Sequence, residues 1–172
     1  DLLLTASGAD NGGTNRGSAW TMFSTLIDDV GTTTGNIKSL ATGTNYNIRY
    51  DGGANAQTIT ALGALDVGDV NGDSTADLVM GFPGASAGGA YIIFSTLIDD
   101  VTTTGNNLSL ATSTNYNIRY DGAANGDALT TAAGLDNGDV NGDGLGDLAL
   151  GTALADNNGN GSRFVVGALQ NQ

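Results

Sequence analysis

Short apolar runs recur along this chain between polar segments rich in glycine, asparagine, threonine and aspartate. Runs that follow an aspartate lie at residues 2–4, 78–80 and 148–150, and runs led by an aromatic residue lie at 20–23, 91–94 and 164–166. Continuous apolar runs of this length are typical of strands buried on both faces. No segment keeps the 3.6-residue period of an amphipathic helix. The pattern therefore predicts an all-β protein.

A different pattern marks the strand that ends each unit. Tyr46, Ile48 and Tyr50 alternate with polar residues, and residues 116–120 repeat the alternation. Strict alternation predicts a half-exposed outer strand with the three apolar side chains on one face. Runs rich in alanine and glycine at 59–67 and 129–136 predict a crowded first strand, where backbones approach closely.

The chain repeats itself with a period of about seventy residues. Residues 24–30, 44–52 and 68–73 recur unchanged as 95–101, 114–122 and 138–143. Each unit thus contains four strands, the inner ones buried on both faces and the outer one on a single face. A propeller blade has this pattern, because each blade is packed between two others.

The repeats divide the chain into about two and a half blades of four-stranded antiparallel sheet. We expect strands two to four of a partial blade at residues 1–57, a complete blade at 58–127, and strands one to three of another at 128–172. Closed propellers contain roughly four to eight blades. The expected partners are therefore other blades, supplied by a longer chain or by associated copies.

Residues 139–147 place oxygen-bearing side chains at alternate positions of one loop. Asp139, Asn141, Asp143 and Asp147 occupy loop positions one, three, five and nine, and the carbonyl of Leu145 lies at position seven. Calcium prefers such a set of oxygen ligands. Glycines 142, 144 and 146 separate the ligands, where sharp turns and positive φ angles suit glycine. The loop is predicted to bind Ca²⁺.

A second loop of the same type lies seventy residues earlier. Its candidate ligands are Asp69, Asn71, Asp73, the carbonyl of Thr75, and Asp77. An EF-hand would need a glutamate at position twelve, and the chain contains no glutamate. Aspartate and asparagine also form simple turns, but like charges ~4 Å apart repel by about 1 kcal/mol even in water. We therefore expect two Ca²⁺ sites, and Asp1 matches position nine of a third loop.

Composition narrows the compartment and the chemistry. Eighteen acidic and five basic residues give a net charge of −13, which argues against nucleic acid or an anionic membrane as partner. The absence of cysteine and histidine removes disulfides, thiolate catalysis, histidine triads and the usual zinc sites. Weak all-oxygen loops suit millimolar calcium outside the cell. With no apolar run long enough to insert in a membrane, we expect a secreted or cell-surface protein.

Residues 68–86 (GDVNGDSTADLVMGFPGAS) and 138–156 (GDVNGDGLGDLALGTALAD) resemble the FG-GAP repeats of integrin α-subunit propellers. Residues 81–84 stand at the Gly-Ala-Pro turn of the family, whereas residues 152–154 depart from it. The resemblance implies a seven-bladed propeller as the usual architecture, calcium in the loop between the first two strands of a blade, and extracellular adhesion or binding of a protein or glycan ligand.

Several functions remain open at the level of sequence. The leading hypothesis is a calcium-binding, non-catalytic adhesion or scaffold module. Alternatives are a carbohydrate-binding accessory module of a secreted enzyme and a self-assembling extracellular fibre. A hydrolase would need paired carboxylates, but calcium explains the regular aspartate clusters better. Trp20 is expected in the core, the Arg-Tyr-Asp triplets at 49–51 and 119–121 in strands, and the acidic pairs at 28–29 and 99–100 in solvated turns.

Overall fold

The computed structural model describes residues 1–27, 35, 37–84, 86–98, 103–131, 134–152 and 154–155, and the backbone of 164–167. The acidic pairs at 28–29 and 99–100 lie outside the described residues. The described strands are β1 (Leu2–Ala6), β2 (Ser18–Met22), β3 (Ile48–Asp51), β4 (Leu65–Gly68), β5 (Asp77–Gly81), β6 (Gly89–Ile93), β7 (Asn106–Ser109), β8 (Ile118–Asp121), β9 (Leu135–Gly138), β10 (Asp147–Gly151) and β11 (Phe164–Gly167). The described helical turns are α1 (Ser24–Ile27), α2 (Ser95–Ile98) and the 3-10 turns η1 (Gly43–Asn45), η2 (Ala61–Gly63) and η3 (Ser113–Asn115).

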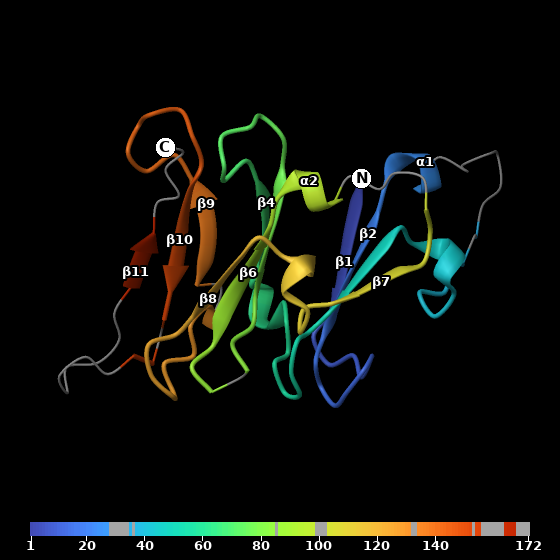
Figure 1. Cartoon of the computed structure of the whole chain (residues 1–172), viewed down its shortest axis with the longest axis horizontal. Coiled ribbons are helices and arrows are strands. Elements are labelled where there is room, and N and C mark those ends of the chain that lie inside the picture. Colours follow the sequence, from blue (N-terminus) through green and yellow to red (C-terminus); the bar gives the residue numbers. More distant parts are fainter. Residues whose placement is uncertain are drawn as a thin grey trace.

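The strands form three sheets that stand side by side (Figure 1). Blade 1 has the order β1-β2-β3-β7, blade 2 the order β4-β5-β6-β8, and blade 3 the order β9-β10-β11. Neighbouring strands are antiparallel except for β3 and β7, which are parallel. The all-β prediction is confirmed, and the three sheets form a partial propeller.

Apolar side chains fill the spaces between the sheets. In β5, Leu78 and Met80 belong to a cluster shared with blade 1, whereas Val79 belongs to a cluster shared with blade 3. All residues of β2, β5 and β6 are buried. Each fully buried side chain of this size contributes about 1.5–3 kcal/mol. The inner strands thus have the two buried faces that their continuous apolar runs predicted.

The first strand of blade 1 differs from this expectation. Leu2 is 43% exposed and Leu4 39% exposed. The equivalent strands β5 and β10 each pair with a preceding strand, but in the described part of the chain β1 pairs with β2 alone. Leu2 and Leu4 are the equivalents of Leu78 and Met80, which pack against the preceding blade, and no described blade covers the corresponding face of β1.

The outer strand β3 also differs from its prediction, because it is almost entirely buried. Ile48 and Tyr50 face blade 2, as the alternation indicated, but Tyr46 packs on the opposite side with Trp20 and Met22. The strand begins only at Ile48, after the η1 turn, so Tyr46 lies before the regular alternation. Trp20 is 6% exposed, as expected of a core residue.

Besides the contact of Ile48 and Tyr50 with blade 2, β3 is covered at its outer edge by β7, a strand that the sequence analysis did not predict. This strand lies in the connection between α2 and β8, yet it pairs with β3 of the preceding blade. In Figure 1 it runs, in yellow, along the outer side of blade 1. Its sequence, Asn-Asn-Leu-Ser, has too little apolar alternation to be identified as a strand.

None of the described helices is long and apolar enough to cross a membrane.

Candidate metal centre

The two predicted calcium loops connect equivalent strands. One joins β4 to β5 and the other joins β9 to β10, and both project from the same end of the sheets (Figure 1). Asp77 pairs with Gly68, and Asp147 pairs with Gly138, at the base of each loop. Each antiparallel pair thereby brings loop positions one and nine close together.

The aspartate at position one is held by backbone donors. The Asp69 carboxylate accepts hydrogen bonds from the N–H groups of Gly72 at 2.7 Å, Asp73 at 3.1 Å and Ser74 at 2.7 Å. In the second loop, Asp139 accepts the equivalent bonds from residues 142, 143 and 144 at 2.7, 3.0 and 2.8 Å. Both carboxylates are thus held inside their loops in the same way.

The asparagine at position three links the remaining side chains. The Asn71 amide oxygen accepts a hydrogen bond from the Asp73 N–H at 2.8 Å. Its amide nitrogen donates to Asp73 Oδ2 at 3.1 Å and lies 3.5 Å from Asp77 Oδ1. Asn141 bonds the Asp143 N–H at 2.9 Å and donates to Asp147 at 3.4 Å. These hydrogen bonds therefore link the residues at positions three, five and nine in each loop.

The aspartates at position nine are the buried members of the two loops. Asp77 is fully buried and Asp147 is 3% exposed. Asp77 accepts hydrogen bonds from the N–H groups of Val70 at 3.0 Å and Ser95 at 2.9 Å. Burial raises the pKa of Asp77, and the negative charges of Asp73 and Asp69 raise it further, against the opposing effect of these two bonds. A cation beside these carboxylates would relieve that repulsion.

The residues at position seven can contribute only one backbone group to a metal. The N–H of Thr75 donates to Asp73 Oδ1 at 2.8 Å, and the N–H of Leu145 donates to Asp143 Oδ1 at 2.9 Å. The Thr75 hydroxyl also donates to Asp73, and together these bonds lower the pKa of the exposed Asp73 carboxyl. The carbonyl oxygens of the two residues are therefore the backbone groups that could hold a metal.

The donor set of both loops has the chemistry that calcium requires, namely carboxylate, amide and carbonyl oxygens. However, no three acidic side chains among the described residues gather closely around one point. In the first loop, the Asn71 amide nitrogen lies between Asp73 and Asp77 instead. Rotation of the Asn71 and Asp73 side chains would be needed for their oxygens to converge on an ion.

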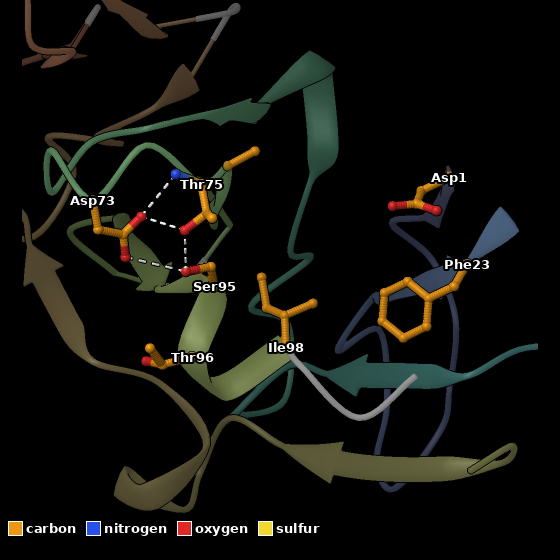
Figure 2. Close-up of a pocket in the computed structure, with 8 residues that line it drawn as sticks. Asp1, Phe23, Asp73, Thr75, Ser95, Thr96 and Ile98 are labelled. Atoms are coloured by element: carbon orange, nitrogen blue, oxygen red, sulfur yellow. Dashed lines mark hydrogen bonds between the residues drawn. The ribbon is translucent and has the colours of Figure 1, made fainter. Parts of the chain in front are cut away.

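A participant that the sequence analysis missed is the serine that begins α2. The Ser95 N–H donates to Asp77, and its hydroxyl donates to Asp73 Oδ2 at 3.2 Å (Figure 2). In blade 1 the Ser24 N–H donates to Asp1 at 2.8 Å, so Asp1 has the place of Asp77. The repeated segment STLIDDV begins with both serines, which is the signal that could have revealed them.

The first loop borders an open pocket of about 460 Å³ between blades 1 and 2. Figure 2 shows Asp73, Thr75 and Ser95 on one side of this pocket, and Asp1 and Phe23 on the other. Both Asp73 and Thr75 are exposed. The loop ligands can therefore be reached by an ion from solvent.

Glycines have two different roles in the second loop. Gly142 and Gly144 have φ angles of 81° and 87°, as the predicted sharp turns require. Gly146 has an ordinary φ, but a Cβ there would lie 2.5 Å from the carbonyl oxygen of Asp69 in the first loop. Gly146 is therefore required for the close approach of blade 3 to blade 2.

One family model matches the part of the chain that contains the first loop. Residues 61–93 match the family model of the FG-GAP repeat, which covers η2, β4, the first loop, β5 and β6. No curated protein matches the chain. The resemblance predicted from the sequence is thus confirmed for blade 2: residues 61–93 match an FG-GAP repeat, which suggests an extracellular adhesion or propeller-type module.

Proposed function

We propose that each of the two loops binds one Ca²⁺, and that the chain is a non-catalytic adhesion or scaffold module stabilised by calcium. The observation that carries this proposal is the equivalent hydrogen-bond network of the two loops. Asp69 and Asp139 are each held by three backbone N–H groups at matching positions. Two unrelated turns would have little reason to share this arrangement.

Calcium would act mainly on stability. In the first loop the ion would be held by Asp69, Asn71, Asp73, Asp77 and the Thr75 carbonyl, and in the second by the equivalent groups of residues 139, 141, 143, 147 and 145. The ligands come from both strands of a hairpin, so a bound ion would join the two strands. An ion at a hundred times its dissociation constant adds about 2.7 kcal/mol per site. Two ions would change the net charge from −13 to −13 + 4 = −9.

A structural role for the aspartates also favours a binding module over an enzyme. The loop carboxylates accept backbone hydrogen bonds, and the sequence contains no histidine or cysteine to act beside them as base or nucleophile. Because all-oxygen loops of modest affinity are filled at millimolar calcium, the proposed setting is extracellular.

The test is calcium titration of the full chain by isothermal calorimetry, together with thermal unfolding in calcium and in EDTA. The wild-type chain should bind two ions and melt at a higher temperature in calcium. Asp143→Ala should reduce the stoichiometry to one. Asp136→Ala removes the same charge outside the loop, where the carboxylate accepts a hydrogen bond from the Asn137 N–H and from no other described residue, and should still bind two. Unchanged stoichiometry in Asp143→Ala would refute the ligand assignment.

A further inference from the structure

The outer edge of blade 1 is covered by a strand that belongs to the next repeat. β7 pairs in parallel with β3, with Asn106 opposite Ile48 and Ser109 opposite Asp51. Backbone hydrogen bonds extend this pairing at both ends: the Gly105 N–H donates to the Tyr46 carbonyl at 2.9 Å, and the Leu110 N–H donates to the Asp51 carbonyl at 2.8 Å. The contact thus spans residues 105–110.

Side chains make this contact specific. The Tyr46 hydroxyl donates to Asn107 Oδ1 at 2.7 Å, and the Asn47 amide nitrogen donates to the Thr103 carbonyl at 3.1 Å. Leu110 follows the strand and is only 1% exposed, in the apolar cluster between blades 1 and 2. The edge of β3 therefore recognises a strand with polar groups at its start and a leucine at its end.

Blade 2 presents the same edge without such a strand. Residues 114–122 are identical to residues 44–52, and in the described part of the chain the sheet of blade 2 ends at β8. Tyr50 in β3 is fully buried, whereas its equivalent Tyr120 is 36% exposed. The side-chain exposure of the equivalent aspartates rises from 10% in Asp51 to 57% in Asp121. Part of this difference comes from the segment of β7, since Leu110 packs in the same cluster as Tyr50, and part from the strands of blade 2 that face Tyr50.

In blade 2, the equivalents of the polar groups that hold β7 on blade 1 make only some of the same hydrogen bonds. The Asn117 amide oxygen accepts the Phe94 N–H at 2.7 Å, just as Asn47 accepts the Phe23 N–H at 2.8 Å. Among the described residues, however, the Asn117 amide nitrogen and the Tyr116 hydroxyl have no partner. The carbonyls of residues 116, 117 and 121 likewise accept no hydrogen bond from a described residue. Within the described part of the chain, blade 2 thus has free groups at the positions of blade 1 that bond residues 103, 105, 106, 107 and 110.

We propose that the edge of β8 binds a parallel strand with the sequence Gly-Asn-x-x-Ser-Leu, supplied by a further repeat of the same kind. Its asparagine would lie opposite Ile118 and its serine opposite Asp121. Residues 35–40 of the first repeat fit the same pattern, with Ile37 in the place of Asn107, and there Ile37 is 96% exposed and residues 37–39 form no strand. Each complete repeat therefore offers one edge that accepts a strand and one strand that is donated to the preceding blade.

The edges of β3 and β8 differ at the residue that follows the repeated segment, which is Gly53 in blade 1 and Ala123 in blade 2. A Cβ at Gly53 would lie 2.8 Å from the Leu110 carbonyl oxygen. The equivalent residue in blade 2 is Ala123, so its methyl group must push the leucine end of an incoming strand outwards. The edge of β8 should bind its strand more weakly than β3 does, and Ala123→Gly should tighten the binding.

The test is an NMR titration of the ¹⁵N-labelled full chain with a peptide that has the sequence of residues 103–110. Saturable shifts are expected in the amides of β8 and not in those of β3, because the covalently attached β7 already occupies β3 at high effective concentration. A peptide with proline in place of Asn106 should not bind, because the Asn106 N–H donates to the Asn47 carbonyl in blade 1 at 3.1 Å and proline has no N–H.

Protein variants separate the proposed edge from non-specific peptide binding. Tyr116→Phe removes only the hydroxyl that would bond the peptide, and should weaken binding about three- to tenfold. Tyr46→Phe is the matched control and should leave the peptide affinity unchanged. Ala123→Gly should strengthen binding. Unchanged affinity in both Tyr116→Phe and Ala123→Gly would overturn the proposal.

Two further results would also overturn it. The first is an absence of β8 shifts at millimolar peptide, even in Ala123→Gly. The second is self-association of the chain, measured by sedimentation, that the peptide reverses, because the strand would then come from a second copy. None of these outcomes depends on calcium, so the proposed function can fail without affecting this test.

Discussion

Position six of the two proposed calcium loops needs the same left-handed backbone conformation in both repeats, but the residue there differs. Ser74 has a φ of 68°, and the equivalent Gly144 has a φ of 87°. The left-handed conformation costs a residue with a Cβ roughly 1–2 kcal/mol, whereas glycine adopts it freely. The first loop is therefore strained at a position where the second is not.

We predict that Ser74→Gly stabilises the protein. Relief of the strain should exceed the larger backbone entropy that glycine loses on folding, for a net gain of up to about 1 kcal/mol. The N–H of residue 74 would still donate to Asp69. Urea unfolding measures the change, with Gly144→Ser as the reciprocal variant, which should lose stability. A loss of stability in Ser74→Gly would show that the serine side chain has a stabilising contact of its own.

A second prediction concerns the pH dependence of the calcium effect. Burial, and then the charges of Asp73 and Asp69, raise the pKa of Asp77. Without calcium, the raised pKa of Asp77 favours the fold at low pH, and this contribution is lost as the pH rises through the folded pKa. Calcium needs the ionised carboxylate, so the calcium-dependent rise in Tm should be complete at neutral pH. As the pH is lowered, this calcium-dependent rise in Tm should begin to shrink while the pH is still above about 3.9, the ordinary pKa of aspartate, because Asp77 is protonated earlier.

Thermal unfolding with calcium and with EDTA, from neutral pH down to about pH 3, checks this prediction. The difference between the two Tm values is the quantity of interest, because the acid sensitivity of other carboxylates affects both curves. A calcium increment that stays constant over the whole range would exclude Asp77 as a ligand.

At the scale of elements, β7 is the part of the fold that the sequence did not reveal. The inner strands could be identified because burial on both faces requires apolar runs, and the two loops could be located because oxygen-bearing side chains recur in them at alternate positions. β7 has neither signal. Its pairing depends on the exposed edge of β3 in another blade, which is a tertiary contact about sixty residues away in the chain. Ser95 was missed for the same reason, since it reaches Asp77 and Asp73 only in the folded blade.

We predict that Leu110→Ala destabilises the chain by about 2–5 kcal/mol. Leu110 is fixed in the cluster between blades 1 and 2 by the pairing of β7. Its repeat equivalent Leu40 is only partly buried, against the cluster that contains Trp20, Met22 and Tyr46. Leu40→Ala is therefore the matched control and should cost clearly less in urea unfolding. Equal losses in the two variants would mean that β7 adds little to the contact between blades.

At the scale of the whole molecule, stability resides in the contacts between neighbouring blades. Separate clusters join blade 1 to blade 2 and blade 2 to blade 3. The valine at position two of each loop shows how these contacts depend on a neighbour. Val70 is 1% exposed against blade 3, whereas the equivalent Val140 is 69% exposed.

We predict that Val70→Ala costs about 1.5–3 kcal/mol, from lost burial and the cavity it leaves. Val140→Ala should be nearly neutral in the same chain, because its side chain is already exposed. Thermal or urea unfolding of both variants checks the difference. Similar losses would indicate that the valine acts within its own loop and not between blades.

The pairing of β7 with the preceding blade also determines how the molecule responds to tension. Because a strand of the second repeat is hydrogen-bonded to the first blade, a force that separates blades 1 and 2 must break the β3–β7 pairing and withdraw Leu110 from the cluster between them. The chain passes from blade 1 to blade 2, and β7 then returns from the second repeat to pair with β3 of blade 1. In a protein exposed to mechanical load, this arrangement would make neighbouring repeats yield together and not one at a time.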